Sequence, residues 1–255
     1  MKTSNKILFG ALIVALLSAI IFMLVARTNV SEHPNAQNAN SDNNTLVKTL
    51  AETHDFNTFD LGFNNVYFFD ETYEGISVNG PSSAVSAIRV SNELPLRFYY
   101  EGYPNASEKK LIVRIGIKNK TGFDITLHGN AKCNTNAADL DAKSISANGN
   151  AVIELNVKTE SLLLSTEGNG RVYANIEAAT VSATANGNGK LKFHDDSQIN
   201  KLNVSISGNA SITGGIADSV SGSISENGKL ELDQINNKGG VLTSGNGRDR
   251  SNYTE

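Results

Sequence analysis

Apolar and polar residues alternate through the second half of the chain, in a block that recurs about every 20 residues. Each block contains a Gly-Asn pair, or once a Glu-Asn pair, and successive Asn residues of these pairs are 18 to 21 positions apart. The residues three, five and seven places before each Asn are mainly apolar, as in Leu127, Ile125 and Phe123. The first six Asn residues are also followed by an apolar residue three places later. This period-2 alternation predicts two strands in each block, each with one buried face.

A repeat of this length is typical of stacked structural units that share one core. We therefore predict an all-β fold whose main part, residues 121–247, is a parallel β-helix of about seven coils of about 19 residues each. Helical repeats would need a period near 3.6, and a propeller blade needs about 40 residues or more. With coils about 4.8 Å apart, the stack would be on the order of 35 Å long.

The Asn residues at the turns have two structural roles available. Asn tolerates the left-handed backbone conformation that sharp turns require, and its side-chain amide can form hydrogen bonds with the equivalent Asn of the next coil. We predict a structural ladder rather than a ligand site at these positions, which are Asn130, Asn150, Asn169, Asn188, Asn209, Asn227 and Asn246. In the sixth turn Glu226 replaces Gly, and we expect the neighbouring Gly228 to absorb the strain.

The N-terminal segment contains a charge-free apolar run at residues 7–25. At about 1.5 Å per residue this run is long enough for a transmembrane helix. Because Lys2 and Lys6 precede it, we predict a signal anchor with residues 1–6 in the cytoplasm and the rest of the chain exported. Cleavage after the segment Leu24-Val25-Ala26 is the alternative, in which the run acts as a signal peptide.

Two segments of different composition separate this run from the repeats. Residues 26–50 are polar and lack sustained periodicity, which is typical of a flexible tether. Residues 51–120 are rich in aromatic side chains, and their alternation continues without an Asn turn. Because the open end of a solenoid exposes apolar surface and strand edges, we predict an N-terminal cap with irregular first strands over this range. At the other end, residues 248–255 form a polar, charged tail.

The aromatic residues of the cap also suggest a binding role, which is compatible with capping. Aromatic rings stack on sugars, and tyrosine adds a polar hydroxyl, so such a surface would engage a glycan or a protein. The candidate partner-binding residues are Tyr67, Tyr73, Tyr99, Tyr100 and Tyr103.

Residues suited to catalysis or metal binding are few. The best cluster is His194-Asp195-Asp196, which would serve a carbohydrate-active enzyme, and counting from the turn Asn places Asp196 in register with Glu177. Consecutive polar residues of this kind are typical of a solvated loop, so we predict no catalytic residue, no cofactor and no metal site. The single cysteine, Cys133, falls in an aliphatic column, which indicates a buried apolar side chain rather than a reactive thiol.

The repeat units carry a family resemblance. The segments Ser165-Thr166-Glu167-Gly168-Asn169-Gly170 and Thr184-Ala185-Asn186-Gly187-Asn188-Gly189, behind the lead-in Phe56-Asn57-Thr58-Phe59-Asp60-Leu61, resemble the putative auto-transporter adhesin head GIN domain family. The resemblance covers about residues 55–247 and implies a β-helical surface domain of an exported bacterial protein. It implies no catalytic residues. The chain departs from the Gly-Ser-Gly corners common in that family by using Asn almost throughout.

Together these features favour a membrane-anchored, exported and non-enzymatic adhesion-type module, periplasmic or at the cell surface. Its partner would be a glycan, a cell-envelope component or a protein, besides the membrane that holds the anchor. The net charge of -4 disfavours nucleic acid, whose phosphates repel a negatively charged surface. Two alternatives remain, a structural envelope scaffold that self-associates and a carbohydrate-active β-helix enzyme. The oligomeric state is left open.

Overall fold

The computed structural model describes residues 45–51, 57–91, 93–101, 109–118, 120–135, 139–237 and 239–254. All of these described residues belong to one compact unit. The run predicted to cross the membrane, residues 7–25, lies outside the described residues, and so does the predicted cytoplasmic segment 1–6. None of the helices within the described ranges combines the length and the hydropathy that a membrane span needs.

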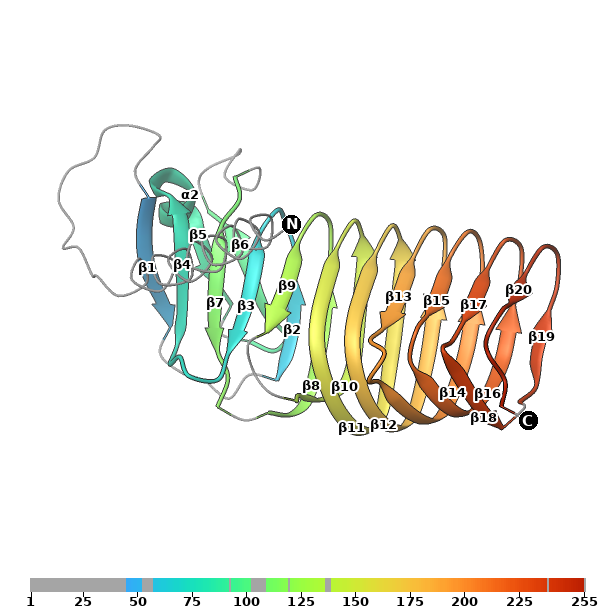
Figure 1. The fold of residues 1–255 in the computed structure, drawn as a ribbon. Coiled ribbons are helices and arrows are strands. Elements are labelled where there is room, and N and C mark those ends of the chain that lie inside the picture. The colour runs from blue at the N-terminus through green and yellow to red at the C-terminus, as the bar shows by residue number, and fades with distance from the viewer. Residues whose placement is uncertain are drawn as a thin grey trace, which may run out of the picture. The chain divides into compact units, whose positions relative to one another are not determined.

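The described ranges contain twenty strands and one short helix, which confirms the all-β prediction (Figure 1). The N-terminal elements are β1 (Thr45–Ala51), β2 (Thr58–Leu61), β3 (Val66–Asp70), β4 (Ile76–Pro81), α2 (Ser82–Ala87), β5 (Ile88–Val90), β6 (Leu96–Tyr100) and β7 (Ile112–Gly116). The repeats begin with β8 (Thr121–Leu127), β9 (Lys132–Thr135), β10 (Asp141–Gly149), β11 (Val152–Gly168), β12 (Arg171–Ala185) and β13 (Lys190–Phe193). They end with β14 (Gln198–Ile206), β15 (Ser211–Thr213), β16 (Ile216–Ile224), β17 (Lys229–Glu231), β18 (Gln234–Asn237), β19 (Val241–Thr243) and β20 (Arg248–Asp249).

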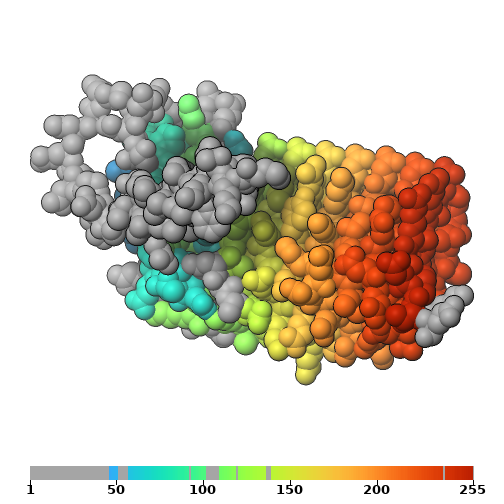
Figure 2. Space-filling view, in the orientation of Figure 1, coloured from blue at the N-terminus to red at the C-terminus, as the bar shows by residue number. Residues whose placement is uncertain are grey.

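Each coil consists of a strand before the Asn turn, a strand after it and a return segment, as the repeat predicts. Equivalent strands of successive coils pair in parallel: Ile145 lies between Ile125 and Leu164 on the side before the turn. Figure 1 shows the turns along one edge of the stack, and Figure 2 shows the coils as successive bands of colour without gaps between them. The predicted parallel β-solenoid of about seven Asn-turn coils is therefore confirmed.

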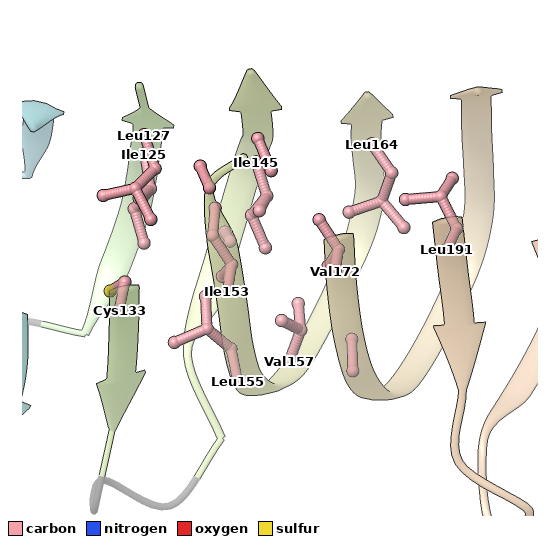
Figure 3. Packing of buried hydrophobic residues seen from close by; sticks show 14 of the residues in the cluster. Ile125, Leu127, Cys133, Ile145, Ile153, Leu155, Val157, Leu164, Val172 and Leu191 are labelled. Atoms are coloured by element: carbon pink, nitrogen blue, oxygen red, sulfur yellow. The ribbon is translucent and has the colours of Figure 1, made fainter. Parts of the chain in front are cut away.

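The core is a set of aliphatic rows that run through the stack. On the strands after the turn, Cys133, Ile153, Val172 and Leu191 form one row, each at most 1% exposed (Figure 3). They occupy the apolar position three places after each Asn, and the strand period of 2 turns them inward. Full burial of an aliphatic side chain contributes about 1.5–3 kcal/mol, so each added coil brings its own stabilising layer.

A further coil precedes the seven predicted ones. Strands β2 and β3 stack directly on β8 and β9, so that Phe59 pairs with Ile125 and Tyr67 with Cys133. The turn between β2 and β3 has Asn64 at the Asn position. The prediction that no Asn turn occurs before residue 121 is therefore wrong. The turn escapes recognition because Phe63 stands where all but one of the other coils have Gly, and Phe63 adopts the left-handed φ of 68°.

The described residues within 71–120, between this coil and the next, form the N-terminal cap. Within it, β6 and β7 add parallel strands to β2 and β3, and β4 pairs with β7 in the antiparallel direction. Strand β1 then pairs antiparallel with β4. The tether predicted for residues 26–50 is therefore wrong at its end: residues 45–50 belong to β1, and Leu46 and Leu50 pack against the core.

The C-terminal residues also belong to the fold rather than to a free tail. Strand β20 pairs with β17, and Tyr253 forms a bridge with Ile235. The backbone amide of Thr254 donates to the carbonyl of Ile235 at 2.9 Å. The prediction of a polar tail at residues 248–255 is therefore wrong for residues 248–254. These residues continue the last coil with the same parallel pairing.

Candidate binding surface

Each coil reverses direction at a four-residue turn whose second residue has a left-handed backbone. In the turn that contains Gly149, the amide of Ala151 donates to the carbonyl of Asn148, and Gly149 has a φ of 74°. A positive φ at the first central residue is the geometry of a type II′ turn. The left-handed backbone conformation that was considered for the turn Asn is therefore adopted by the residue before it, which is Gly149 in this turn. Glu226, with a φ of 57°, adopts this conformation itself, so the expectation that Gly228 absorbs the strain is wrong.

The Asn side chains connect the coils along the turn edge. Nδ2 of each Asn donates to Oδ1 of the Asn in the preceding coil, with distances of 2.9 to 3.3 Å. The ladder runs through Asn130, Asn150, Asn169, Asn188, Asn209, Asn227 and Asn246. Each interior Asn therefore uses one donor and one acceptor on its neighbours, which is a structural role.

Two of the five candidate tyrosines pack where the additional coil meets the cap, Tyr67 on β3 and the half-buried Tyr100 on β6. Tyr67 is fully buried, and its hydroxyl donates to the carbonyl of Gly62 at 2.8 Å. The amide of the buried Asn65 donates to the Tyr67 hydroxyl and accepts a hydrogen bond from the Tyr100 hydroxyl, both at 3.2 Å. Burial raises the pKa of both tyrosines, so both stay neutral. This network joins the first coil to β6, and it leaves Tyr67 inaccessible to a partner.

The other candidate tyrosines do not make a continuous platform. The Tyr73 ring lies 4.5 Å from the guanidinium of Arg114, which also forms an ion pair with Asp70. Tyr99 is 48% exposed on β6. Tyr103 lies outside the described residues. Other aromatic residues supply the core of the first coils, where Phe59 stacks on Phe123 and meets Phe69 edge-on.

The loop with His194, Asp195 and Asp196 does not assemble a catalytic cluster. His194 lines a hollow of about 330 Å³ with Phe68 and Glu154, whereas Asp196 lines a separate hollow of about 280 Å³. Across the described residues no group of three or more His, Cys, Asp or Glu side chains is placed to hold a metal ion.

The prediction that Asp196 lies in register with Glu177 of the preceding coil is wrong. Ala174 pairs with Phe193 but Glu177 pairs with Gln198, so the loop at 194–197 adds two residues to its coil. The buried Ser197 fixes this loop, because its Oγ accepts a hydrogen bond from the amide of Ile176 at 3.0 Å.

An open groove of about 760 Å³ lies on the return side of the coils. Lys158 and Glu177, which are register partners, form an ion pair across it with Nζ 2.7 Å from Oε1. This pair raises the pKa of Lys158. The lining also contains the charged side chains of Asp141, Lys143 and Glu160 and uncharged ones such as Thr159 and Ser161, so the groove is polar and open.

Cys133 is not available for chemistry in the folded protein. The side chain is fully buried in the aliphatic row, as its column predicts. Burial raises the pKa of the thiol, and a thiol that stays protonated is a poor nucleophile.

A set of cations on the strands after the turns escaped the sequence analysis. Seven cationic side chains project from this side of the coils, and we call them the basic face: Lys132, Arg171, Lys190, Lys192, Lys229, Arg248 and Arg250. Lys229 is half-buried and the others are exposed. Five of them stand two places after a turn Asn, so aligning the repeats on that Asn and inspecting the polar columns would have found them.

The comparisons with known proteins agree with this architecture. Residues 63–233 match the model of the family described as "Putative auto-transporter adhesin, head GIN domain". The chain belongs to this family. The resemblance of the repeat segments to the GIN domain family is thereby confirmed, and the match begins at the turn of the additional coil. A comparison with curated proteins gives no match.

Solved structures share the fold of this GIN domain protein at low sequence identity. A putative adhesin from Bacteroides fragilis is 16% identical with a TM-score of 0.61, covering 83% of this chain and 98% of that one. A putative lipid binding protein from Parabacteroides distasonis is 15% identical with a TM-score of 0.59, covering 83% and 96%. A putative adhesin from Parabacteroides merdae is 16% identical with a TM-score of 0.56, covering 84% and 98%.

Proposed function

We propose that this GIN domain protein is an exported, membrane-anchored and non-enzymatic binding module of the cell envelope. The observation that carries the proposal is the repeated polar surface over a continuous core. Four places before the turn Asn, for example, the coils present Thr126, Ser146, Ser165, Thr184, Ser205 and Ser223. Such columns offer the same weak contact many times along the stack, and linked weak contacts give high avidity for an extended partner.

The family and the chemistry of the surface support a binding role over an enzymatic one. The family is described as the head GIN domain of a putative auto-transporter adhesin, and the similar solved proteins from Bacteroides fragilis and Parabacteroides merdae are described as putative adhesins. His194 and Asp196, the candidates for acid–base chemistry, line different hollows. General acid–base catalysis needs both groups within hydrogen-bond reach of one substrate.

The location of the protein is inferred from its N-terminal sequence. The apolar run at residues 7–25, preceded by Lys2 and Lys6, supports a signal anchor with the solenoid on the far side of the membrane. The solenoid would then meet glycans or proteins of the envelope, in the periplasm or at the cell surface. Protease treatment of intact and permeabilised cells tests this placement, because a cytoplasmic solenoid would resist digestion until the inner membrane is broken.

Binding and hydrolysis are separated by one experiment. The full chain, purified in detergent, is incubated with isolated envelope polysaccharides and envelope proteins, and both retention and new reducing ends are measured. We expect retention without new reducing ends. Release of sugars that is lost in a variant with His194→Ala and Asp196→Asn would establish an enzyme instead. Absence of retention by every envelope fraction would refute the binding module.

A further inference from the structure

The basic face is a straight, nearly continuous column. Backbone pairing places Lys132, Val152, Arg171, Lys190, Ser211, Lys229 and Arg248 next to one another in consecutive coils. Lys192 and Arg250 extend the face sideways, two residues further along the chain than Lys190 and Arg248. Six steps of about 4.8 Å separate Lys132 from Arg248, so the column is about 29 Å long.

Like charges are neighbours in this column, which is unfavourable for the sheet. Arg171 and Lys190 are direct register partners, and like charges directly opposite one another destabilise paired strands. The same solenoid uses opposite charges at an equivalent pairing on its return side, where Lys158 and Glu177 form their ion pair. The uncompensated cations therefore bring the fold no stabilisation of their own, which indicates a role in binding.

Few carboxylates balance the basic face. Within the part of the chain that the structure describes, Lys229 alone among these cations forms an ion pair, with Glu231. That contact lowers the pKa of Glu231. Glu154 is the other carboxylate in the adjoining column of β11. Seven cations and two carboxylates leave a net charge of +5 on this face, whereas the whole chain carries -4.

We propose that the basic face binds a linear acidic polysaccharide that lies along the axis of the solenoid. This inference rests on the proposed binding function and names its ligand class and its surface. A net charge of +5 over about 29 Å corresponds to about one positive charge per 6 Å, which suits an extended chain with spaced carboxylates. Double-stranded DNA carries one negative charge per about 1.7 Å, a much denser array. The Ser/Thr column on the strands before the turn is uncharged, so the acidic ligand is directed to one side.

The binding test uses the full chain in detergent and three labelled polymers. These are polygalacturonate as the acidic polysaccharide, dextran as the neutral polysaccharide and a short DNA duplex. We expect binding to polygalacturonate that weakens as salt rises, because cations on the protein displace counterions from the polymer. We expect no binding to dextran. Absence of polygalacturonate binding, or tighter binding to the duplex, would overturn the proposal.

Matched variants assign the binding to this face. One variant carries Arg171→Gln, Lys190→Gln and Lys192→Gln, and its control carries Lys143→Gln, Lys158→Gln and Lys201→Gln on the return side, with the same change in net charge. We expect the first to weaken polygalacturonate binding by about tenfold and the control to change it little. Equal losses would show a nonspecific effect of net charge and refute the site. If circular dichroism shows that the first variant is unfolded, Arg248→Gln with Arg250→Gln tests the same face.

The two proposals can fail separately. A variant of the basic face that still retains envelope material as well as the wild type would refute the acidic polysaccharide on this face and leave the binding module intact. Loss of all retention in the wild type would refute both.

Discussion

Two glycines at equivalent turn positions provide a test of how tightly the coils are stacked. Gly129 and Gly208 have nearly the same backbone conformation, with φ of 70° and 73°. A Cβ atom added at Gly208 would lie 2.6 Å from the carbonyl oxygen of Gly187 in the preceding coil. A Cβ atom at Gly129 would meet nothing closer than 3.5 Å, the carbonyl oxygen of Phe63. The substitutions Gly129→Ala and Gly208→Ala therefore share the strain of a positive φ and differ in the available space.

The expected losses of stability follow from these two contributions. A left-handed backbone costs an L-residue about 1–2 kcal/mol, and part of this is offset because Ala reduces the entropy of the unfolded chain. We expect Gly129→Ala to lower the free energy of unfolding by about 1 kcal/mol. At Gly208 the backbone of the neighbouring coil must also move, and overpacking of this kind costs a further 1–3 kcal/mol or so.

Thermal unfolding followed by circular dichroism measures the difference. For a chain of this size about 1 kcal/mol shifts the Tm by roughly 2–4 °C, so Gly208→Ala should lower the Tm at least twice as far as Gly129→Ala. Equal shifts in the two variants would refute the argument that the space between coils, and not φ alone, excludes a side chain. Absence of any shift in Gly129→Ala would refute the left-handed strain itself.

Three further substitutions or labelling experiments test single residues. Thr166 is 1% exposed, and its hydroxyl has no hydrogen-bond partner among the described residues. The substitution Thr166→Val should therefore raise the free energy of unfolding by about 1 kcal/mol in urea titrations, whereas Thr166→Ser should not. Glu226→Gly should stabilise the protein by about 0.5–1 kcal/mol relative to Glu226→Ala, because Gly accepts the φ of 57° without strain; equal stability of the two variants would contradict this. Cys133 should resist thiol reagents at pH 7 to 9 and react fully after denaturation, because burial raises the pKa of its thiol. Rapid labelling of the folded protein would be inconsistent with the position of Cys133 in the core.

The repeats were predictable because each coil uses the same positions for the same purpose. Ile125, Ile145 and Leu164 stand five places before their turn Asn, and in the structure they pair side by side in the core. The additional coil was not predictable in this way. Its partner positions on β8 lie 66 residues further along the chain, as in the pair of Phe59 and Ile125, and Phe63 hides the turn signature. Pairing between distant segments leaves no local periodicity to recognise.

The candidate site was predictable only in part, since a change in coil length alters which residues become neighbours. The two extra residues at 194–197 shift the register, so that Gln198 and not Asp196 pairs with Glu177. The tyrosine candidates failed for a related reason. A composition rich in aromatic residues does not reveal which rings turn inward, and Tyr67 and Tyr100 are joined through Asn65, whose position depends on the stacking of β2, β3 and β6.

The basic face shows why the net charge of a solenoid is a poor guide to its partners. Residues 19 positions apart become neighbours about 4.8 Å apart, so a short list of cations such as Arg171 and Lys190 becomes a dense column. Carboxylates such as Glu177 lie on the return side of the coils, and Glu177 is six residues along β12 from Arg171, which corresponds to about 20 Å along the strand. The Debye length is about 8 Å at physiological salt, so such carboxylates are largely screened from a ligand on the basic face. The chain can therefore be acidic as a whole and still present a surface that attracts an acidic polymer.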